Sequence, residues 1–193
     1  VLGVLALGIG VEQADIPNAL AMFRSEIRKY KGREIPLFST EAGFESRVGS
    51  VDHLRDHARW EVRYAMILKG EGVRLHLAFY QFDFGIGANR AETWGFCFNL
   101  DPKMSFGPKE IAPKPAVPAY AVCAKMLFTA RPVQNLRWWG KDVWGYVFED
   151  QGEPLLAVWH PYRRQLCRVP VGDVARVTVT SIMGHETVVP AKD

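Results

Sequence analysis

The sequence predicts a mixed fold, with an α/β segment over residues 1–129 followed by an all-β segment over residues 130–193. Helical and strand-like patterns alternate through the first segment, which is the order that builds a parallel sheet. Beyond Ala130 the pattern changes to short runs of alternating polarity separated by turns, which is typical of an antiparallel sheet. The dipeptide Arg131-Pro132 marks the predicted boundary between the two domains.

The first predicted helix begins at Asp15, a residue type that caps helix N-termini. Pro17 falls in the first turn, where a missing N–H has no consequence. Apolar residues then recur three or four apart and predict one buried stripe, formed by Leu20, Phe23, Ile27 and Tyr30. Gly32 is the expected end of the helix.

The stretch Ile35–Phe44 reads as a short, fully buried strand that stops at Glu41, followed by Ala-Gly. A strand buried on both faces accepts a charge only where it leaves the sheet, so Glu41 is expected at the carboxyl end. Parallel α/β folds place their chemistry at that end. Judged on these ten residues alone, a solvated strand end with a glycine turn is the plainer alternative.

Three further elements complete the α/β segment. Ser50 is a plausible cap for a second helix, whose apolar stripe runs from Leu54 to Leu68 and which stops near Gly70 and Gly72. Val73–Tyr80 reads as a second buried strand. A glycine-containing loop over residues 81–93 leads to the aromatic segment Trp94–Phe98. A third helix is expected at about Pro115 to Phe128.

Four strands are expected in the all-β segment, with turns at Asp150-Gln151-Gly152, at Pro161-Tyr162 and at Gly184. Their predicted ranges are Val143–Glu149, Pro154–His160, Gln165–Val169 and Val174–Ser181.

Composition and charge give no indication of a nucleic-acid or membrane partner. The net charge of +3 is spread along the chain without a basic block, which gives no argument for nucleic acid. The three cysteines are widely spaced and form neither a metal pattern nor a disulfide framework. The opening run Val1–Ile9 lacks the basic flank of a signal peptide and is too short to span a membrane. This apolar run resembles an internal segment of a folded domain, so we expect the sequence to be a fragment of a longer chain.

Three short motifs are weak. Gly85 and Gly87 follow a strand as in a dinucleotide loop, but the sixth position is Arg90 and no helix begins there. Asp83-Phe84-Gly85 matches a kinase tripeptide without the other kinase motifs, so we reject it. His53 and His57 have the spacing of zinc ligands but lack the glutamate that zinc proteases need, which favours a solvated helix face.

Aromatic residues crowd the end of the second strand, where Phe79, Tyr80 and Trp94 form either ordinary core or a platform on which a sugar stacks. Four tryptophans lie in the all-β segment, and strand alternation predicts that about half of them are core; they are Trp138, Trp139, Trp144 and Trp159.

The segment Pro36–Gly43 resembles the seventh strand of clan A glycoside hydrolases, which are (β/α)8 TIM barrels. In that clan the glutamate closing this strand is the catalytic nucleophile, and Glu41 stands at that position. Val73–Tyr80 is similar to the eighth strand, and Lys114–Tyr120 is similar to the start of the eighth helix. The β-rich remainder is similar to the β-sandwich of the β-xylosidase and α-L-iduronidase group, and the order of these short motifs is the stronger signal.

The resemblance implies the last two or three strands of a TIM barrel followed by an antiparallel β-sandwich, truncated at both ends. Val1–Ile9 would at most be a remnant of the sixth strand. The clan's acid/base glutamate follows an asparagine, and this sequence contains no Asn-Glu pair. We therefore expect the C-terminal part of a retaining glycosidase that is inactive by itself.

The implied substrate is an oligosaccharide or glycoside, and no cofactor or metal is needed. Tyr80, Gln81 and Trp94 are the candidates for the sugar pocket. Arg47 either holds the charge of the Glu41 nucleophile or lies on the surface. The alternative is a non-catalytic carbohydrate-binding or structural β-sandwich with a vestigial α/β segment. A doubly wound enzyme is disfavoured because no phosphate-binding loop accompanies the strands.

Overall fold

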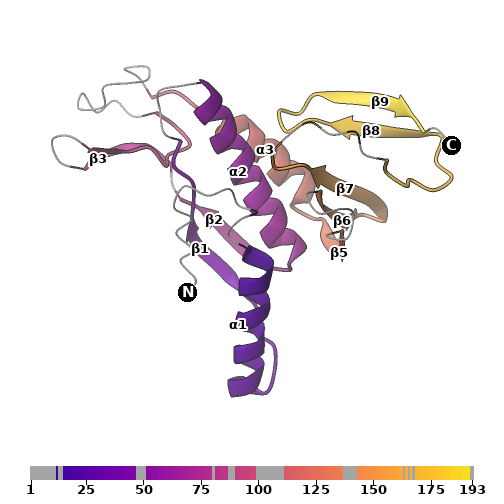
Figure 1. Cartoon of the computed structure of the whole chain (residues 1–193), viewed down its shortest axis with the longest axis horizontal. Helices are drawn as coiled ribbons and strands as arrows, with labels where there is room; N and C mark the ends of the chain where they lie inside the picture. Colours follow the sequence, from indigo (N-terminus) through magenta and orange to yellow (C-terminus); the bar gives the residue numbers. More distant parts are fainter. Residues whose placement is uncertain are drawn as a thin grey trace.

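The computed structural model describes residues 12, 15–46, 51–79, 81–86, 90–98, 111–136, 143–162, 164, 166 and 168–191. Three helices and nine strands lie in these ranges, and Figure 1 shows their arrangement. The helices are α1 (Ile16–Lys31), α2 (Val51–Gly70) and α3 (Ala116–Leu127). The strands are β1 (Phe38–Ala42), β2 (Leu75–Ala78), β3 (Phe84–Ile86), β4 (Arg90–Glu92), β5 (Arg131–Asn135), β6 (Trp144–Asp150), β7 (Glu153–Trp159), β8 (Arg176–Thr180) and β9 (Glu186–Pro190).

Helix α1 confirms the predicted range but not the predicted cap. Asp15 has a left-handed backbone (φ 44°) and caps no backbone N–H; its carboxylate instead accepts a hydrogen bond from Asn18 Nδ2 at 2.6 Å. Gly32 ends the helix in the left-handed conformation and donates to Arg28 O at 2.8 Å, as expected.

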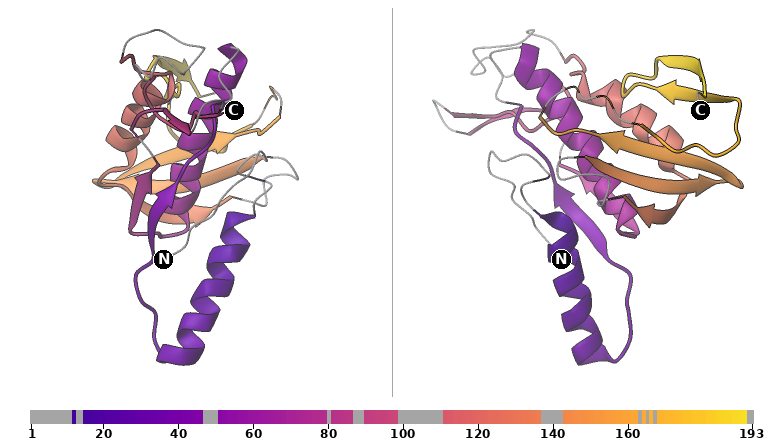
Figure 2. Two further views of the ribbon diagram at one scale, coloured as in Figure 1. Left: turned by 90° about the vertical axis from the view of Figure 1, so that its left-hand side faces the viewer. Right: turned by 45° about the vertical axis from the view of Figure 1, so that its right-hand side comes forward.

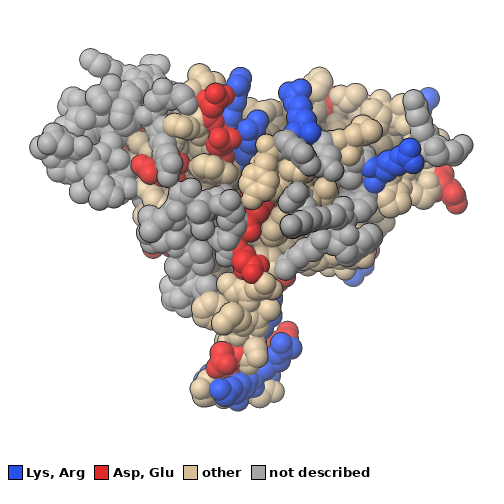
Figure 3. Space-filling model, viewed as in Figure 1, with Lys and Arg blue, Asp and Glu red and all other residues tan. Residues whose placement is uncertain are grey.

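The apolar stripe predicted for α1 is buried only at its start. Ile16 and Leu20 belong to the core, whereas Tyr30 is 74% exposed, because the second half of the helix projects from the body (Figure 1). Figure 3 shows basic and acidic side chains gathered at the projecting tip. In the last turn of the helix, Arg28 pairs with Glu34 at 3.1 Å.

Strands β1 and β2 are connected by helix α2 and pair in parallel, which confirms the predicted strand–helix–strand unit. The expectation that both strands are buried on both faces is wrong for the described chain. Phe38, Leu75 and Leu77 are 46%, 45% and 49% exposed, and we call them the open face of the pair. The face is open because α2 covers only the other side, where Ser39 is buried, and no described strand or helix covers this one.

Helix α2 lies at the centre of the molecule, between the β1–β2 pair and the sheet β5–β6–β7 (Figures 1 and 2). Gly70 at its end has no room for a side chain, since an added Cβ would lie 2.1 Å from the ring of Tyr146. The next residue, Glu71, accepts hydrogen bonds from Asn135 Nδ2 at 2.7 Å and from Tyr146 OH at 3.0 Å. The end of α2 therefore anchors the sheet to the α/β segment.

From residue 81 onwards the chain departs from prediction in four places. Residues 84–86 and 90–92, expected as part of a loop, form the antiparallel hairpin β3–β4. Strands β5 and β9 are not among the predicted strands, and β5 begins at Arg131-Pro132, the expected domain boundary. The strand predicted at 165–169 is wrong for the described residues 166, 168 and 169, which belong to none. The strands β6, β7 and β8 and the turn with positive φ at Gln151-Gly152 match expectation.

One core runs through both halves of the described chain. It joins Ile16 and Leu20 of α1, the buried side of α2 and the sheet residues Tyr146 and Phe148. Burying these side chains together stabilises the two halves as a unit. The boundary at residue 130, the barrel and the sandwich stay predictions. Among the helices that the structure describes, none is both long enough and apolar enough to cross a bilayer.

Candidate active site

Glu41 lies at the carboxyl end of β1 and is exposed. The pairing of β1 with β2 shifts by one residue between Ser39 and Ala42, so both Thr40 and Glu41 face solvent before Ala42 is buried again. Among the described residues the Glu41 carboxylate has no hydrogen bond or ion pair. It is an accessible carboxylate on an irregular strand end, the arrangement that directs a side chain out of a sheet.

The two residues after Glu41 are fixed against the end of β2. Ala42 O accepts a hydrogen bond from Phe79 N at 2.7 Å. A Cβ on Gly43 would lie 2.0 Å from Phe79 O, so only glycine permits this approach of the two backbones. The carboxyl ends of both strands therefore meet at one edge of the sheet, which we call the rim.

The loop that follows is tied to the aromatic segment. Ser46 donates to Thr93 O twice, from its backbone N at 2.9 Å and from its Oγ at 2.7 Å. Trp94, the next residue, is half-buried and follows directly on this contact with the loop after Glu41. The Gln81 side chain is exposed, and its backbone O accepts from Cys97 N at 2.9 Å. Two other predicted site residues, Tyr80 and Arg47, lie outside the described residues.

Beneath the rim, Lys114 and Asp83 form a wholly buried ion pair with Nζ and Oδ1 2.5 Å apart. Lys114 Nζ also donates to Ser46 Oγ at 3.0 Å and to Thr93 O at 3.2 Å, and Asp83 Oδ1 accepts from Gly95 N at 2.9 Å. Burial raises the pKa of Asp83 and lowers the pKa of Lys114, while their mutual hydrogen bond acts in the opposite direction on each. This pair joins the segments that contain Ser46, Asp83 and Thr93–Gly95 to Lys114, which lies two residues before helix α3.

A second buried pair comes from helix α2, where His57 Nε2 lies 3.5 Å from Glu61 Oε1 and both side chains are fully buried. The expectation of a solvated helix face is therefore wrong for His57, which packs edge-on against Phe96, with ring centroids 5.9 Å apart. His53, one turn earlier, is exposed. Glu61 Oε1 accepts a hydrogen bond from Phe44 N at 2.9 Å, which connects the helix to the rim loop.

Burial dominates the protonation of this second pair. It lowers the pKa of His57 from 6.5 to about 3, with the positive charge of Lys114 adding to the effect. It raises the pKa of Glu61 well above 4.5, although the Phe44 N–H and Lys114 act in the opposite direction. Both shifts favour the uncharged forms, as expected for ionisable groups without solvent.

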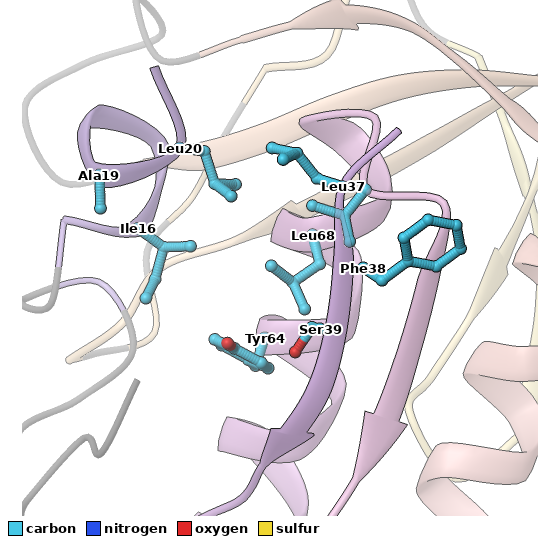
Figure 4. Close-up of a pocket in the computed structure, with 9 residues that line it drawn as sticks. Ile16, Ala19, Leu20, Leu37, Phe38, Ser39, Tyr64 and Leu68 are labelled. Carbon is cyan, nitrogen blue, oxygen red and sulfur yellow. The ribbon is translucent and has the colours of Figure 1, made fainter. Parts of the chain in front are cut away.

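A cavity of about 20 Å³ lies between α1, β1 and α2, behind the strand that carries Glu41 (Figure 4). Apart from Ser39 and Tyr64, the residues around it are apolar. A space of this size holds about one water molecule, far less than a sugar ring requires. It is a packing gap and separate from the rim.

The aromatic rings of the sheet β5–β6–β7 serve the core. Trp144 and Trp159 stack with centroids 6.1 Å apart, Tyr146 is fully buried beside them, and Trp159 Nε1 donates to Glu12 at 2.7 Å. This fits the expectation that some tryptophans are core; Trp138 and Trp139 lie outside the described residues. The three rings stack on one another and pack against the core.

Sequence reasoning missed the buried groups that support the rim, namely His57, Glu61, Asp83 and Lys114. One signal was present for Glu61, because it falls on the apolar stripe of α2 between Ala58 and Ala65, where a charge is unusual. Lys114 and Asp83 carried no such signal, since each stands in a polar or irregular segment and meets the other only in the fold.

The rim carries the accessible carboxylate of Glu41, and the buried pairs Lys114–Asp83 and His57–Glu61 lie close to the segments that follow it. An accessible carboxylate on a fixed backbone is suited to nucleophilic or acid–base chemistry. In the part of the chain that the structure describes, no three His, Cys, Asp or Glu side chains gather in a way that could hold a metal ion. Comparison of the chain with protein-family models, with curated proteins and with solved structures found no match in any of the three.

Proposed function

We propose that this chain carries the nucleophile of a retaining glycoside hydrolase, and that Glu41 is that nucleophile. The proposal is supported by one observation above all, the exposed Glu41 carboxylate at the carboxyl end of a strand that pairs in parallel with its neighbour. This is the position from which parallel α/β enzymes act on their substrates. The open face beside it belongs to a kind of sheet that is normally covered on both sides, as barrel strands are.

In the proposed reaction a Glu41 oxygen attacks the anomeric carbon of a glycoside. The bond to the leaving-group oxygen breaks and a covalent glycosyl ester forms. Water then attacks that ester, which regenerates the carboxylate and releases the sugar with its configuration retained. A second carboxyl group about 5–5.5 Å away protonates the leaving oxygen in such enzymes. No residue of this chain is assigned to that role, so ordinary glycosides are expected to react very slowly with it.

A probe that needs no proton donor tests the proposal directly. The probe is a 2,4-dinitrophenyl 2-deoxy-2-fluoroglycoside, whose dinitrophenolate leaving group departs without protonation. The fluorine slows hydrolysis of the glycosyl ester, which therefore accumulates. We expect mass spectrometry to find the fluorosugar on the peptide that contains Glu41, with one sugar of a panel of pentoses and hexoses in both anomeric forms.

The matched variants are Glu41→Gln and Glu34→Gln. Glu34 is an exposed carboxylate four residues before β1, and among the described residues it pairs with Arg28. Labelling is expected to vanish in the first variant and to persist in the second. An unlabelled wild-type chain across the whole panel, or a label that survives Glu41→Gln, overturns the assignment.

A further inference from the structure

Glu61 carries a carboxyl group in an unfavourable place. It lies on the buried side of α2 with no exposed surface, and its Oε2 has no hydrogen-bond partner among the residues that the structure describes. A buried polar group without a full set of partners destabilises a fold, so a side chain of this kind calls for a compensating role.

Within the described ranges, the hydrogen bond that Glu61 makes goes to the loop that follows the rim. Its Oε1 accepts from Phe44 N at 2.9 Å, three residues after Glu41. Ala42, between them, is held by β2 through its own O, and Gly43 packs directly on Phe79 O. The backbone that leaves Glu41 is therefore fixed by β2 on one side and by Glu61 on the other.

Neighbouring contacts hold Glu61 itself in place. His57, one turn earlier in α2, lies 3.5 Å from the same oxygen and packs against Phe96 of the aromatic segment. The aromatic segment is tied in turn to the rim loop through Ser46 and Thr93. Glu61 Oε1, which accepts the hydrogen bond from Phe44 N, is therefore held between the loop after Glu41 and His57 of its own helix.

We propose that Glu61 is a positioning residue that sets the place of the Glu41 carboxylate by fixing the backbone at Phe44. This inference rests on the proposed function and deepens it. A reacting group has to be held within about 0.5 Å of its working geometry, and an irregular strand end such as that of β1 does not achieve this unaided. Glu61 supplies the missing constraint from the neighbouring helix.

Two substitutions separate positioning from stability. Glu61→Gln keeps an oxygen that accepts the Phe44 N–H, whereas Glu61→Leu fills the same space without one. Leu removes a carboxyl group that is only partly hydrogen-bonded, but it leaves the Phe44 N–H without its acceptor, so a modest fall in the thermal midpoint is expected. Ile67→Val, a small truncation at another fully buried position of α2, serves as the control for lost stability alone.

The readouts are the rate at which the fluorosugar probe labels Glu41 and the hydrogen-exchange rate of the Phe44 amide. In Glu61→Leu we expect labelling to slow by roughly tenfold to a hundredfold and the amide to exchange faster. Glu61→Gln and Ile67→Val are expected to label within about threefold of the wild-type rate.

The other outcomes separate the proposed function of Glu41 from the positioning role of Glu61. A wild-type chain that is not labelled at all overturns the proposed function. A labelled wild type with an equally fast Glu61→Leu variant, or with an unchanged Phe44 amide, overturns only the positioning role. A Glu61→Gln variant as slow as Glu61→Leu also overturns it, because the hydrogen-bond acceptor would then be insufficient.

Discussion

At the scale of single residues, the described chain buries two pairs of acidic and basic side chains, Lys114 with Asp83 and His57 with Glu61. Lys114 and Asp83 are 31 residues apart and meet at 2.5 Å. His57 and Glu61 are neighbours on one helix turn, but only the fold removes them from solvent. Such groups shape how stability depends on pH as well as how the rim is held.

His57 gives the first prediction on stability. Its pKa is about 3 in the folded chain and near 6.5 when unfolded, so the unfolded chain binds more protons between these values. The stability due to neutral His57 is complete above 6.5 and is lost as the pH falls towards 3. Between about pH 7 and pH 4.5 this amounts to about 2–3 kcal/mol of unfolding free energy.

Replacing His57 by Phe keeps the contact with Phe96 and removes the titration. Urea unfolding at the two pH values is expected to show a smaller acid-induced loss for His57→Phe than for the wild type. Glu61 acts in the opposite direction, because its raised pKa lowers the unfolding free energy of the chain as the pH rises. Glu61 is present in both proteins, so its contribution cancels in the difference between them. Equal losses in the two proteins would contradict the burial of a neutral His57.

At the scale of elements, the buried Lys114–Asp83 pair connects the start of α3 with the segments that carry the rim. Removing one member leaves an uncompensated charge in the core, which destabilises proteins by about 3–5 kcal/mol. Replacing both by apolar side chains removes the charge altogether and is far less harmful.

A double-mutant cycle in urea therefore gives a clear expectation. Asp83→Leu and Lys114→Met are each expected to destabilise the chain strongly, and the double variant to recover about 2–3 kcal/mol relative to their sum. Part of the loss is expected to remain, since Gly95 N also donates to Asp83. Additive effects, with no coupling energy, would show that the two charges do not depend on each other.

At the scale of the whole molecule, one surface stands out. The open face of β1 and β2 presents Phe38, Leu75 and Leu77 beside Glu41, although parallel sheets are normally covered on both faces. Figure 2 shows α2 and the sheet β5–β6–β7 together on the other side of this pair. An apolar surface of this kind binds hydrophobic dyes and promotes association.

We expect the pair Phe38→Thr and Leu77→Thr to lower the fluorescence of a bound hydrophobic dye by at least about half. Stability should change by less than about 1 kcal/mol, since both side chains are already half exposed and Thr suits a strand. Val188→Thr, at an exposed position of the hairpin β8–β9, is the control and should leave the dye signal unchanged. Equal signals from the paired variant and the wild type would show that the dye binds elsewhere.

The sequence alone determined the local elements, because their signals are local. Pro17 and Gly32 delimit α1, Gln151-Gly152 makes the turn between β6 and β7, and the apolar stripe of α2 predicts its length. It also placed Glu41 at a strand end, since a charge ends an apolar run wherever it occurs. Each of these follows from a few adjacent side chains and the backbone geometry that they allow.

Only the tertiary structure decided which residues are buried and what they meet. The hairpin β3–β4 and strand β5 depend on partner strands that a single segment does not reveal. The sequence predicts a solvated helix face for His57, and its burial follows from its packing against Phe96 of the aromatic segment. Burial and pairing between distant segments are set by how the elements pack, and the energy of a charge depends on that packing more than on the residues beside it in the chain.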